Sequence, residues 1–162
     1  MLDDDHFDRL YAEHAKRLFG FLVYRTGDRA LAEDVLADTF ERALRGRRGF
    51  DRRKASEKTW LYTIALNLLR DRARRRAAEG RALERHGQSG SSDSPPEPDT
   101  IEQRGDLQTA LGCLSAEERE TVALRFGADL TMPEIAKLQG APLTTIEGRV
   151  YRALAKLRDE LS

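Results

Sequence analysis

The sequence predicts an all-α protein made of two small helical domains that a flexible linker joins. Apolar residues recur at helical spacing on both sides of residues 78–105, and no useful stretch alternates apolar and polar residues as a strand would. Residues 78–105 are rich in Gly, Ser, Pro and acidic residues, a composition that cannot bury enough surface to offset the entropy of ordering. We therefore predict a domain over residues 1–77, an acidic linker over 78–105 and a second domain over 106–162.

Helix start and stop signals divide the first domain into three helices. The first is expected over about residues 6–26 and ends at Gly27, which is followed by an aspartate. The second is expected over about 29–45 and ends before Gly46. A basic loop then leads to a third helix over about 57–77.

The second domain ends in the pattern of a helix-turn-helix. Ser115 and Glu118 form a predicted capping box, Thr131 caps the next helix, and Gly140 breaks the chain before a longer amphipathic helix. The predicted helices are 106–114, 116–126, 132–139, and a last helix from Thr144 or Thr145 to about Glu160.

Composition excludes several classes of protein. No apolar run is long enough to cross a bilayer, and the acidic start MLDDDHFDRL lacks the features of a signal peptide, so we expect a cytoplasmic chain without membrane insertion. Cys113 is the single cysteine, which rules out an intrachain disulfide. The three histidines are scattered and no phosphate-binding glycine loop or nucleophile–base arrangement is present, so we expect no enzyme, no metal and no cofactor.

The neutral total charge conceals a strong asymmetry along the chain. Residues 1–41 carry 5 Lys or Arg and 10 Asp or Glu, whereas residues 42–76 carry 13 and 3. A concentrated positive field of this kind indicates a polyanionic partner.

The third predicted helix carries part of this charge, in the sequence WLYTIALNLLRDRARRR, residues 60–76. Arginines bind phosphates, aromatics stack on unpaired bases and an amide reads a base edge, so the mixture favours an opened nucleic acid strand. Leu61, Ile64 and Leu68 belong to the core-facing stripe, with Tyr62 on the flank of the polar face. An ordinary amphipathic helix with a solvated arginine end is the alternative. The candidate residues on this helix are Trp60, Tyr62, Thr63, Asn67, Arg70 and Arg74.

The preceding helix carries an acidic stripe. Asp34, Asp38 and Glu41 lie at i, i+4 and i+7, with Glu33 beside them. Complementing the helix dipole, or an i, i+4 pair between Asp38 and Arg42, is the alternative explanation. Because DNA would repel these carboxylates, we expect the stripe to meet a basic protein surface.

The last predicted helix has a polar face suited to the major groove. Arg149 and Lys156 lie at its edges, where phosphate contacts are expected, and Arg152 lies nearer the centre, where bases are read. A plain helical hairpin would share its buried stripe. The candidate residues on this face are Thr144, Thr145, Glu147, Gly148, Arg149, Tyr151, Arg152 and Lys156.

Four blocks of the chain resemble, in order, the blocks of bacterial sigma factors of the small, two-domain extracytoplasmic-function (ECF) type. These blocks are AEDVLADTFERAL, WLYTIALNLLRDRARRR, LSAEERETVALRF and LTMPEIAKLQGAPLTTIEGRVYRALAKLR. The resemblance implies a subunit that binds core RNA polymerase, recognises promoter DNA and helps to open it.

The resemblance also implies roles for the candidate residues. Glu33, Asp34, Asp38 and Glu41 would dock on the clamp helices of the largest polymerase subunit, while the second domain docks on the flap. The loop and helix that follow Phe50 would bind the downstream (minus-ten) element, with Lys54, Ser56, Asn67 and Arg70 at matching places. The last helix would read the upstream (minus-thirty-five) element. Such proteins are often held by an anti-sigma factor, which adds a candidate partner.

Two positions depart from the family pattern. Glu147 and Gly148 stand where a basic or small polar residue followed by serine is usual, so the resemblance implies the fold but does not identify the upstream sequence. The main alternative function is a free-standing helix-turn-helix regulator of transcription, and a second is a helical adaptor that binds only proteins.

Overall fold

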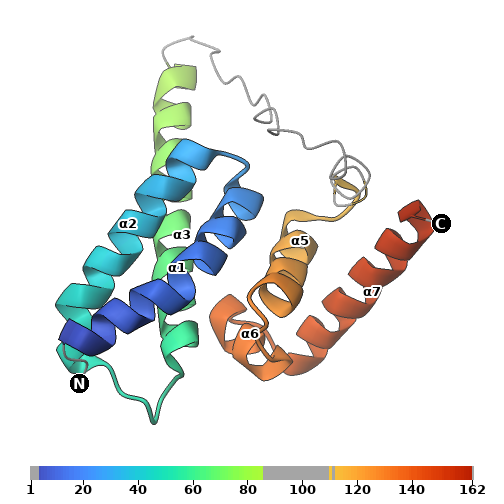
Figure 1. Ribbon diagram of the computed structural model, residues 1–162. Helices are drawn as coiled ribbons and strands as arrows, with labels where there is room; N and C mark the ends of the chain where they lie inside the picture. Colours follow the sequence, from blue (N-terminus) through green and yellow to red (C-terminus); the bar gives the residue numbers. More distant parts are fainter. Residues whose placement is uncertain (1–3, 86–109, 111, 162) are drawn as a thin grey trace.

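The computed structural model describes residues 4–85, 110 and 112–161, and every regular element within these ranges is a helix. Three long helices, α1 to α3, form one group, and α5, α6 and α7 form a second group beside it (Figure 1). The predicted all-α class with two helical domains is confirmed.

α1 (Asp4–Thr26) and α2 (Arg29–Gly46) are joined by a two-residue turn. Gly27 adopts the left-handed region at φ 68°, which glycine reaches without steric cost, and its N–H donates to Val23 O over 2.7 Å. The Asp28 carboxylate then accepts from the Leu31 N–H over 3.1 Å and caps α2. The local sequence therefore fixes both this turn and the start of α2.

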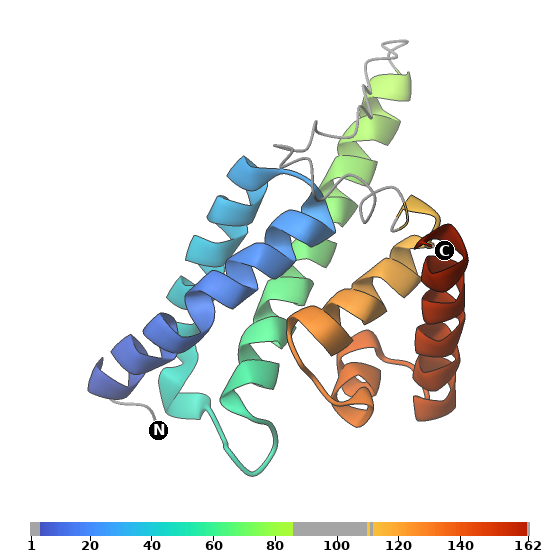
Figure 2. The same cartoon turned by 45° about the vertical axis from the view of Figure 1, so that its right-hand side comes forward.

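α3 (Glu57–Arg85) follows a 3₁₀ turn over Arg47–Gly49 and a loop. The helix was expected to end near residue 77, and it continues to Arg85, so it takes up the first eight residues of the predicted linker. Figures 1 and 2 show its C-terminal end projecting beyond α1 and α2. Alanine and arginine favour helix strongly, which explains why the helix persists without tertiary packing to hold it.

The core of the first domain lies between α1, α2 and α3. Its fully buried side chains include Leu10, Leu18, Leu22, Val35, Leu61, Tyr62 and Leu66. The prediction that Tyr62 flanks an exposed face is wrong, because its side chain is 1% exposed and its ring packs on Phe21 with centroids 5.3 Å apart. Burial raises the pKa of Tyr62 to about 12.

The second domain begins with α5 (Ala116–Val122), where Ser115 and Glu118 form the predicted capping box. The expected helix over 116–126 changes after Val122 into η3 (Ala123–Gly127), a turn of π-helix. The predicted helix over 106–114 and the linker residues 86–105 lie largely outside the described residues.

α6 (Met132–Gln139) and α7 (Leu143–Leu161) form the helix-turn-helix. Thr131 caps α6 through a second capping box with Glu134. Gly140 ends α6 in the left-handed region at φ 63°, so the chain can turn tightly into α7. Ile146, Val150 and Ala153 are buried on one side of α7. The helical spacing also predicts Leu154 and Leu157 on this side, but Leu154 is 39% exposed and Leu157 is half-buried.

We expect Tyr62→Phe to leave the free energy of unfolding unchanged or to raise it by up to about 1 kcal/mol. The Tyr62 hydroxyl is buried and has no hydrogen-bond partner among the described residues. Its removal therefore breaks no hydrogen bond and avoids the cost of desolvating the hydroxyl on folding. Tyr62→Ala should cost about 3–5 kcal/mol, as for other large core side chains. Urea unfolding of both variants measures this, and a stable Tyr62→Ala protein would contradict the core assignment.

Candidate nucleic-acid interface

The outer side of α3 presents most of the polar residues that the sequence predicts to bind nucleic acid. Asn67, Arg70 and Arg74 are exposed along it, and Thr63 is half-buried, with its hydroxyl donating to Thr59 O over 2.7 Å. The opposite side of α3, with Leu61, Ala65 and Leu68, is buried in the core, and this packing fixes the rotation of the helix. The arrangement offers the Asn67 amide and the Arg74 guanidinium group to a ligand, whereas the Arg70 guanidinium donates to Leu138 O of the second domain.

The loop before α3 is shaped by its own polar groups. The Asp51 carboxylate accepts from the Arg53 N–H over 2.9 Å, and Lys54 remains exposed at the tip. Ser56 caps α3, because its hydroxyl accepts from the Thr59 N–H over 3.1 Å. The structure therefore gives Ser56 a role in the fold of the loop, whatever it also contacts.

Trp60 lies at the start of α3 and is half-buried. Its ring packs on Phe50 with centroids 4.7 Å apart, and an atom of its side chain lies 3.8 Å from the position of a Cβ at Gly46. Trp60 therefore packs the loop against the end of α2, and only part of the Trp60 ring is accessible for stacking on a base.

The acidic stripe of α2 divides into free and paired carboxylates. Glu33 and Asp34 are exposed and form no ion pair within the described part of the chain. Asp38 binds Arg72 of α3 at 2.8 Å, so the alternative pairing with Arg42 is wrong. Glu41 binds Arg45 at 2.6 Å. The N-terminal half of the stripe is thus the half available to a partner.

The outer face of α7 carries Thr144, Glu147, Tyr151 and Arg152, all of them exposed. Tyr151 is 78% exposed, so its ring is accessible to a ligand. The Arg152 guanidinium folds back over Gly148, with Nη1 at 3.0 Å from the position that a Cβ would take. The departure from serine at position 148 therefore leaves room for Arg152. Thr145 is half-buried beside this face.

Two cations of α7 are held inside the second domain. Arg149 lies 3.4 Å from a carboxylate oxygen of Glu117 and donates to Gln139 Oε1 over 3.4 Å. Lys156 donates to Glu118 Oε1 over 2.7 Å, and this pairing lowers the pKa of Glu118. Both residues were predicted to lie free at the edges of the DNA-facing surface, and the structure instead gives each a partner on α5.

The second domain contacts α3 near its N-terminus and along its outer side. Lys58 Nζ donates to Ala128 O over 2.9 Å, Thr59 Oγ1 donates to Glu134 Oε2 over 2.6 Å, and Arg70 Nη2 donates to Leu138 O over 3.1 Å. α6 therefore covers the N-terminal half of the face that the sequence assigns to nucleic acid. No local pattern in the sequence predicts this contact.

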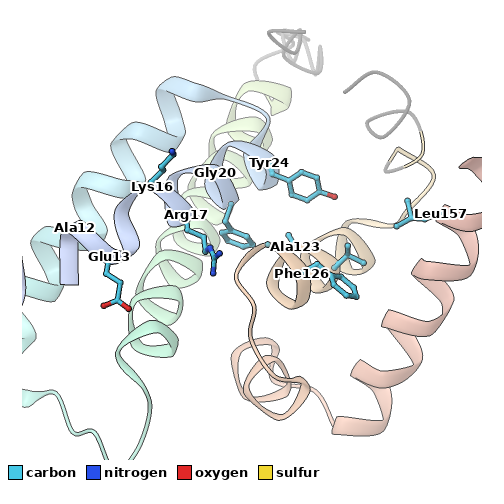
Figure 3. A pocket seen from close by; sticks show the side chains of 12 residues that line it. Ala12, Glu13, Lys16, Arg17, Gly20, Tyr24, Ala123, Phe126 and Leu157 are labelled. Carbon is cyan, nitrogen blue, oxygen red and sulfur yellow. The ribbon is translucent and has the colours of Figure 1, made fainter. Parts of the chain in front are cut away.

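A cleft of about 970 Å³ lies between α1 and the second domain (Figure 3). Arg17, Gly20 and Tyr24 of α1 line one wall, and Phe126 and Leu157 belong to the other. The two walls come from different domains, so the cleft exists only while the domains are packed together. Among the described residues no group of His, Cys, Asp or Glu could hold a metal, and no helix could cross a membrane.

Comparison with known proteins agrees with this geometry. The family model for Sigma-70 region 2 matches residues 10–79, and the model for Sigma-70, region 4 matches residues 104–157. The sigma factor CarQ of Myxococcus xanthus is 32% identical over 97% of this chain and 90% of its own length. The ECF sigma factor BldN of Streptomyces coelicolor is 32% identical over 94% of this chain, which spans 60% of the length of BldN.

Solved structures give the same result. The sigma factor RpoE of Bartonella quintana, in complex with the anti-sigma factor NepR, superposes with a TM-score of 0.74 at 26% identity, covering 96% of each chain. CnrH, in complex with the cytosolic domain of CnrY, gives 0.69 at 28% identity, covering 98% of this chain and 89% of CnrH. Fold and sequence define a two-domain protein of the sigma-70 type. This chain belongs to the ECF family of RNA polymerase sigma factors.

We expect Lys156→Met to lower the free energy of unfolding of the second domain by about 1–3 kcal/mol, because Glu118 is left buried without its charged partner. Lys137→Met is a matched control, since Lys137 of α6 is exposed, and its effect should stay within about 0.5 kcal/mol.

The effect of Lys156→Met should also depend on pH. The pKa of Glu118 is lowered in the folded protein, so its pairing stabilises above the unfolded pKa of about 4.3 and is lost as pH falls through the folded value. Urea unfolding at about pH 7 and about pH 3 should therefore show a difference that shrinks in acid. Equal stability of wild type and Lys156→Met at neutral pH would show that the pair with Glu118 does not stabilise the domain, and Lys156 would again be a candidate DNA contact.

Proposed function

We propose that this chain is a promoter-specificity subunit of bacterial RNA polymerase, acting in the cytoplasm. The observation that carries the proposal is the division of α3 into a buried side and an outer side bearing Asn67, Arg70 and Arg74. Guanidinium groups bind phosphates, and an exposed amide among them can bind a base edge once that base has left the duplex. Membership of the ECF sigma family supports the same assignment.

The other candidate surfaces bind different parts of the promoter. The loop bearing Lys54 and the outer side of α3 bind the downstream element, and the outer face of α7 enters the major groove of the upstream element. Arg152, over Gly148, is the α7 residue best placed to read a base. Arg149 reaches a phosphate only after leaving Glu117. The second domain also docks on the polymerase flap.

Binding of the downstream element requires α6 to leave α3. Thr59 and Arg70 hydrogen-bond to residues of α6 in the present arrangement, so their polar groups are occupied. Core polymerase, which takes the two domains to separate docking sites, supplies the free energy for this separation. An anti-sigma factor is a candidate partner for the closed arrangement, because the similar RpoE structure is a complex with one.

A free-standing helix-turn-helix regulator is the second candidate function, and α7 alone would suit it. The two functions differ in one observable property. A regulator binds its DNA sequence without core polymerase, whereas a sigma factor needs the core enzyme to bind a promoter specifically. Electrophoretic mobility shifts with and without core polymerase distinguish them.

We expect Asn67→Ala to slow promoter opening while leaving core binding unchanged. The exposed amide is lost and no packing changes, so the effect falls on capture of an unpaired base. A template whose downstream element is already unpaired should rescue much of the defect, because base capture then no longer competes with pairing. Opening is measured with a fluorescent base analogue, and normal opening of duplex promoters by Asn67→Ala would show that this side of α3 is structural.

We expect Asp34→Lys to weaken core binding by about tenfold or more, roughly 1.4 kcal/mol. Asp34 is exposed and free, so reversing its charge leaves the fold intact and repels a basic clamp surface. Asp8→Lys, on α1, is the matched control, since it makes the same change at another exposed carboxylate. Equal core affinity of the two variants in a fluorescence titration would remove the acidic stripe from the docking surface.

A further inference from the structure

The first turns of α1 contact the chain on both sides of the loop that carries Lys54. Asp4 Oδ1 lies 3.3 Å from the Arg47 guanidinium, before the loop. His6 Nε2 lies 2.5 Å from Oε1 of Glu57, the first residue of α3 after the loop. Figures 1 and 2 show the start of α1 beside the end of α2, where the loop begins.

Arg52 connects the middle of the loop to the same contact. Its Nη2 lies 3.2 Å from Glu57 Oε1 and 3.1 Å from His6 Nε2. The side chains of His6 and Glu57 are only 27% and 24% exposed, so solvent screens their contact less than it screens a surface ion pair. His6, Arg52 and Glu57 therefore form one cluster, here called the His6 cluster, which joins α1, the loop and α3.

Aromatic packing gives this cluster a firm base on α2. The rings of Phe7 and Tyr11 both pack edge-on against Phe40, with centroids 6.2 and 4.8 Å away. Phe40 is buried in the core of the first domain. Because these rings hold the start of α1 on α2, the place of His6 does not depend on the loop that it contacts.

The His6 cluster differs from the other long-range hydrogen bonds at the start of α3. Lys58 and Thr59 donate to groups of the second domain over 2.9 and 2.6 Å, so these bonds break when the domains separate. His6 and Glu57 both belong to the first domain, so their contact survives the separation. The cluster can therefore order the loop in the state that binds DNA.

We propose that His6 and Glu57 are positioning residues for capture of the unpaired base, because they keep the loop that bears Lys54 ordered after the second domain has left α3. This rests on the proposed function, which assigns that loop to the downstream element. A loop that is already ordered loses less conformational entropy when it binds. Breaking the His6 cluster should therefore weaken binding although no DNA contact is removed.

The test uses three variants of the full chain bound to core polymerase. His6→Ala removes the contact with Glu57, whereas His6→Gln keeps an amide N–H that can donate to the same carboxylate. Arg52→Ala breaks the cluster from its exposed side, where a change endangers the fold least. Arg53→Ala is its matched control, since Arg53 is also exposed but forms no ion pair within the described part of the chain.

The first measurement is hydrogen–deuterium exchange of the loop in this holoenzyme. The N–H groups of Arg53 and Lys54 donate to Asp51, so their protection reports whether the loop keeps its turn. We expect His6→Ala and Arg52→Ala to lower this protection, and His6→Gln and Arg53→Ala to preserve it.

The second measurement is the preference for the downstream element. The templates carry this element unpaired, either as selected by the holoenzyme or with its bases exchanged. His6→Ala and Arg52→Ala should lower the ratio of the two affinities about threefold to tenfold, because a smaller fraction of the protein has the loop ordered. His6→Gln should restore the ratio, and affinity for core polymerase should stay unchanged in all variants.

The combinations of results separate the explanations. A lost preference with unchanged loop protection would overturn the proposal in favour of a direct contact between His6 and DNA. Lower protection with an unchanged preference, or no rescue by His6→Gln, would overturn it in favour of a purely structural cluster. If the wild-type holoenzyme shows no preference for any downstream element, the proposed function itself fails, and this proposal fails with it.

Discussion

The rotation of α3 about its own axis is the constraint on which the rest of the first domain depends. Its inward side consists of Leu61, Tyr62, Ala65, Leu66 and Leu68, all of them buried. Each fully buried leucine contributes about 1.5–3 kcal/mol, so turning the helix by one residue, about 100°, would expose several such side chains at prohibitive cost. The same packing that stabilises the domain therefore fixes Asn67 and Arg70 on the outside.

α7 obeys the same constraint in the second domain. Ile146, Val150 and Ala153 are buried, so Tyr151 and Arg152 must face outward. The cations at the border of the two sides behave differently, because α5 supplies carboxylates that hold Arg149 and Lys156. The exposed face of α7 is consequently narrower than a helical wheel suggests, and centres on Glu147, Tyr151 and Arg152.

The domains also constrain each other. α6 contributes the Glu134 carboxylate and the Leu138 carbonyl to polar groups of α3, and Arg25 of α1 binds Glu120 of α5 at 2.9 Å. The contact is also apolar, because Leu124, Ile135 and Leu138 belong to the same buried cluster as the core of the first domain. Separation of the domains would therefore expose apolar surface, and a larger partner has to compensate that cost. In this arrangement α6 covers part of the α3 face that we propose to bind nucleic acid.

The limits of several helices could be predicted from local signals in the sequence, because short-range contacts determine them. Asp28, Ser115 and Thr131 cap their helices through short-range hydrogen bonds, and Gly27 and Gly140 permit left-handed turns, so helix limits could be read along the chain. The family resemblance, which rests on four blocks in order, was confirmed by the family models and relatives.

Features that depend on distant residues were missed. A wheel of α3 shows two apolar edges, and only packing against α1 decides that Tyr62 is buried. Lys156 meets Glu118 across 38 residues, and the contact between α3 and α6 spans about twice that separation, so neither leaves a local pattern. The length of α3 was underestimated because its last turns carry no apolar stripe, which was the signal used to find helices.

The reactivity of promoter thymines toward permanganate tests directly whether this protein opens promoter DNA together with core polymerase. Promoter fragments selected by the reconstituted holoenzyme would be incubated with core polymerase alone, with this protein alone and with both. We expect unpaired, reactive thymines in the downstream element only when both are present. Sequence-specific binding by this protein alone, with no reactive thymines when core polymerase is added, would contradict this expectation and favour a free-standing regulator.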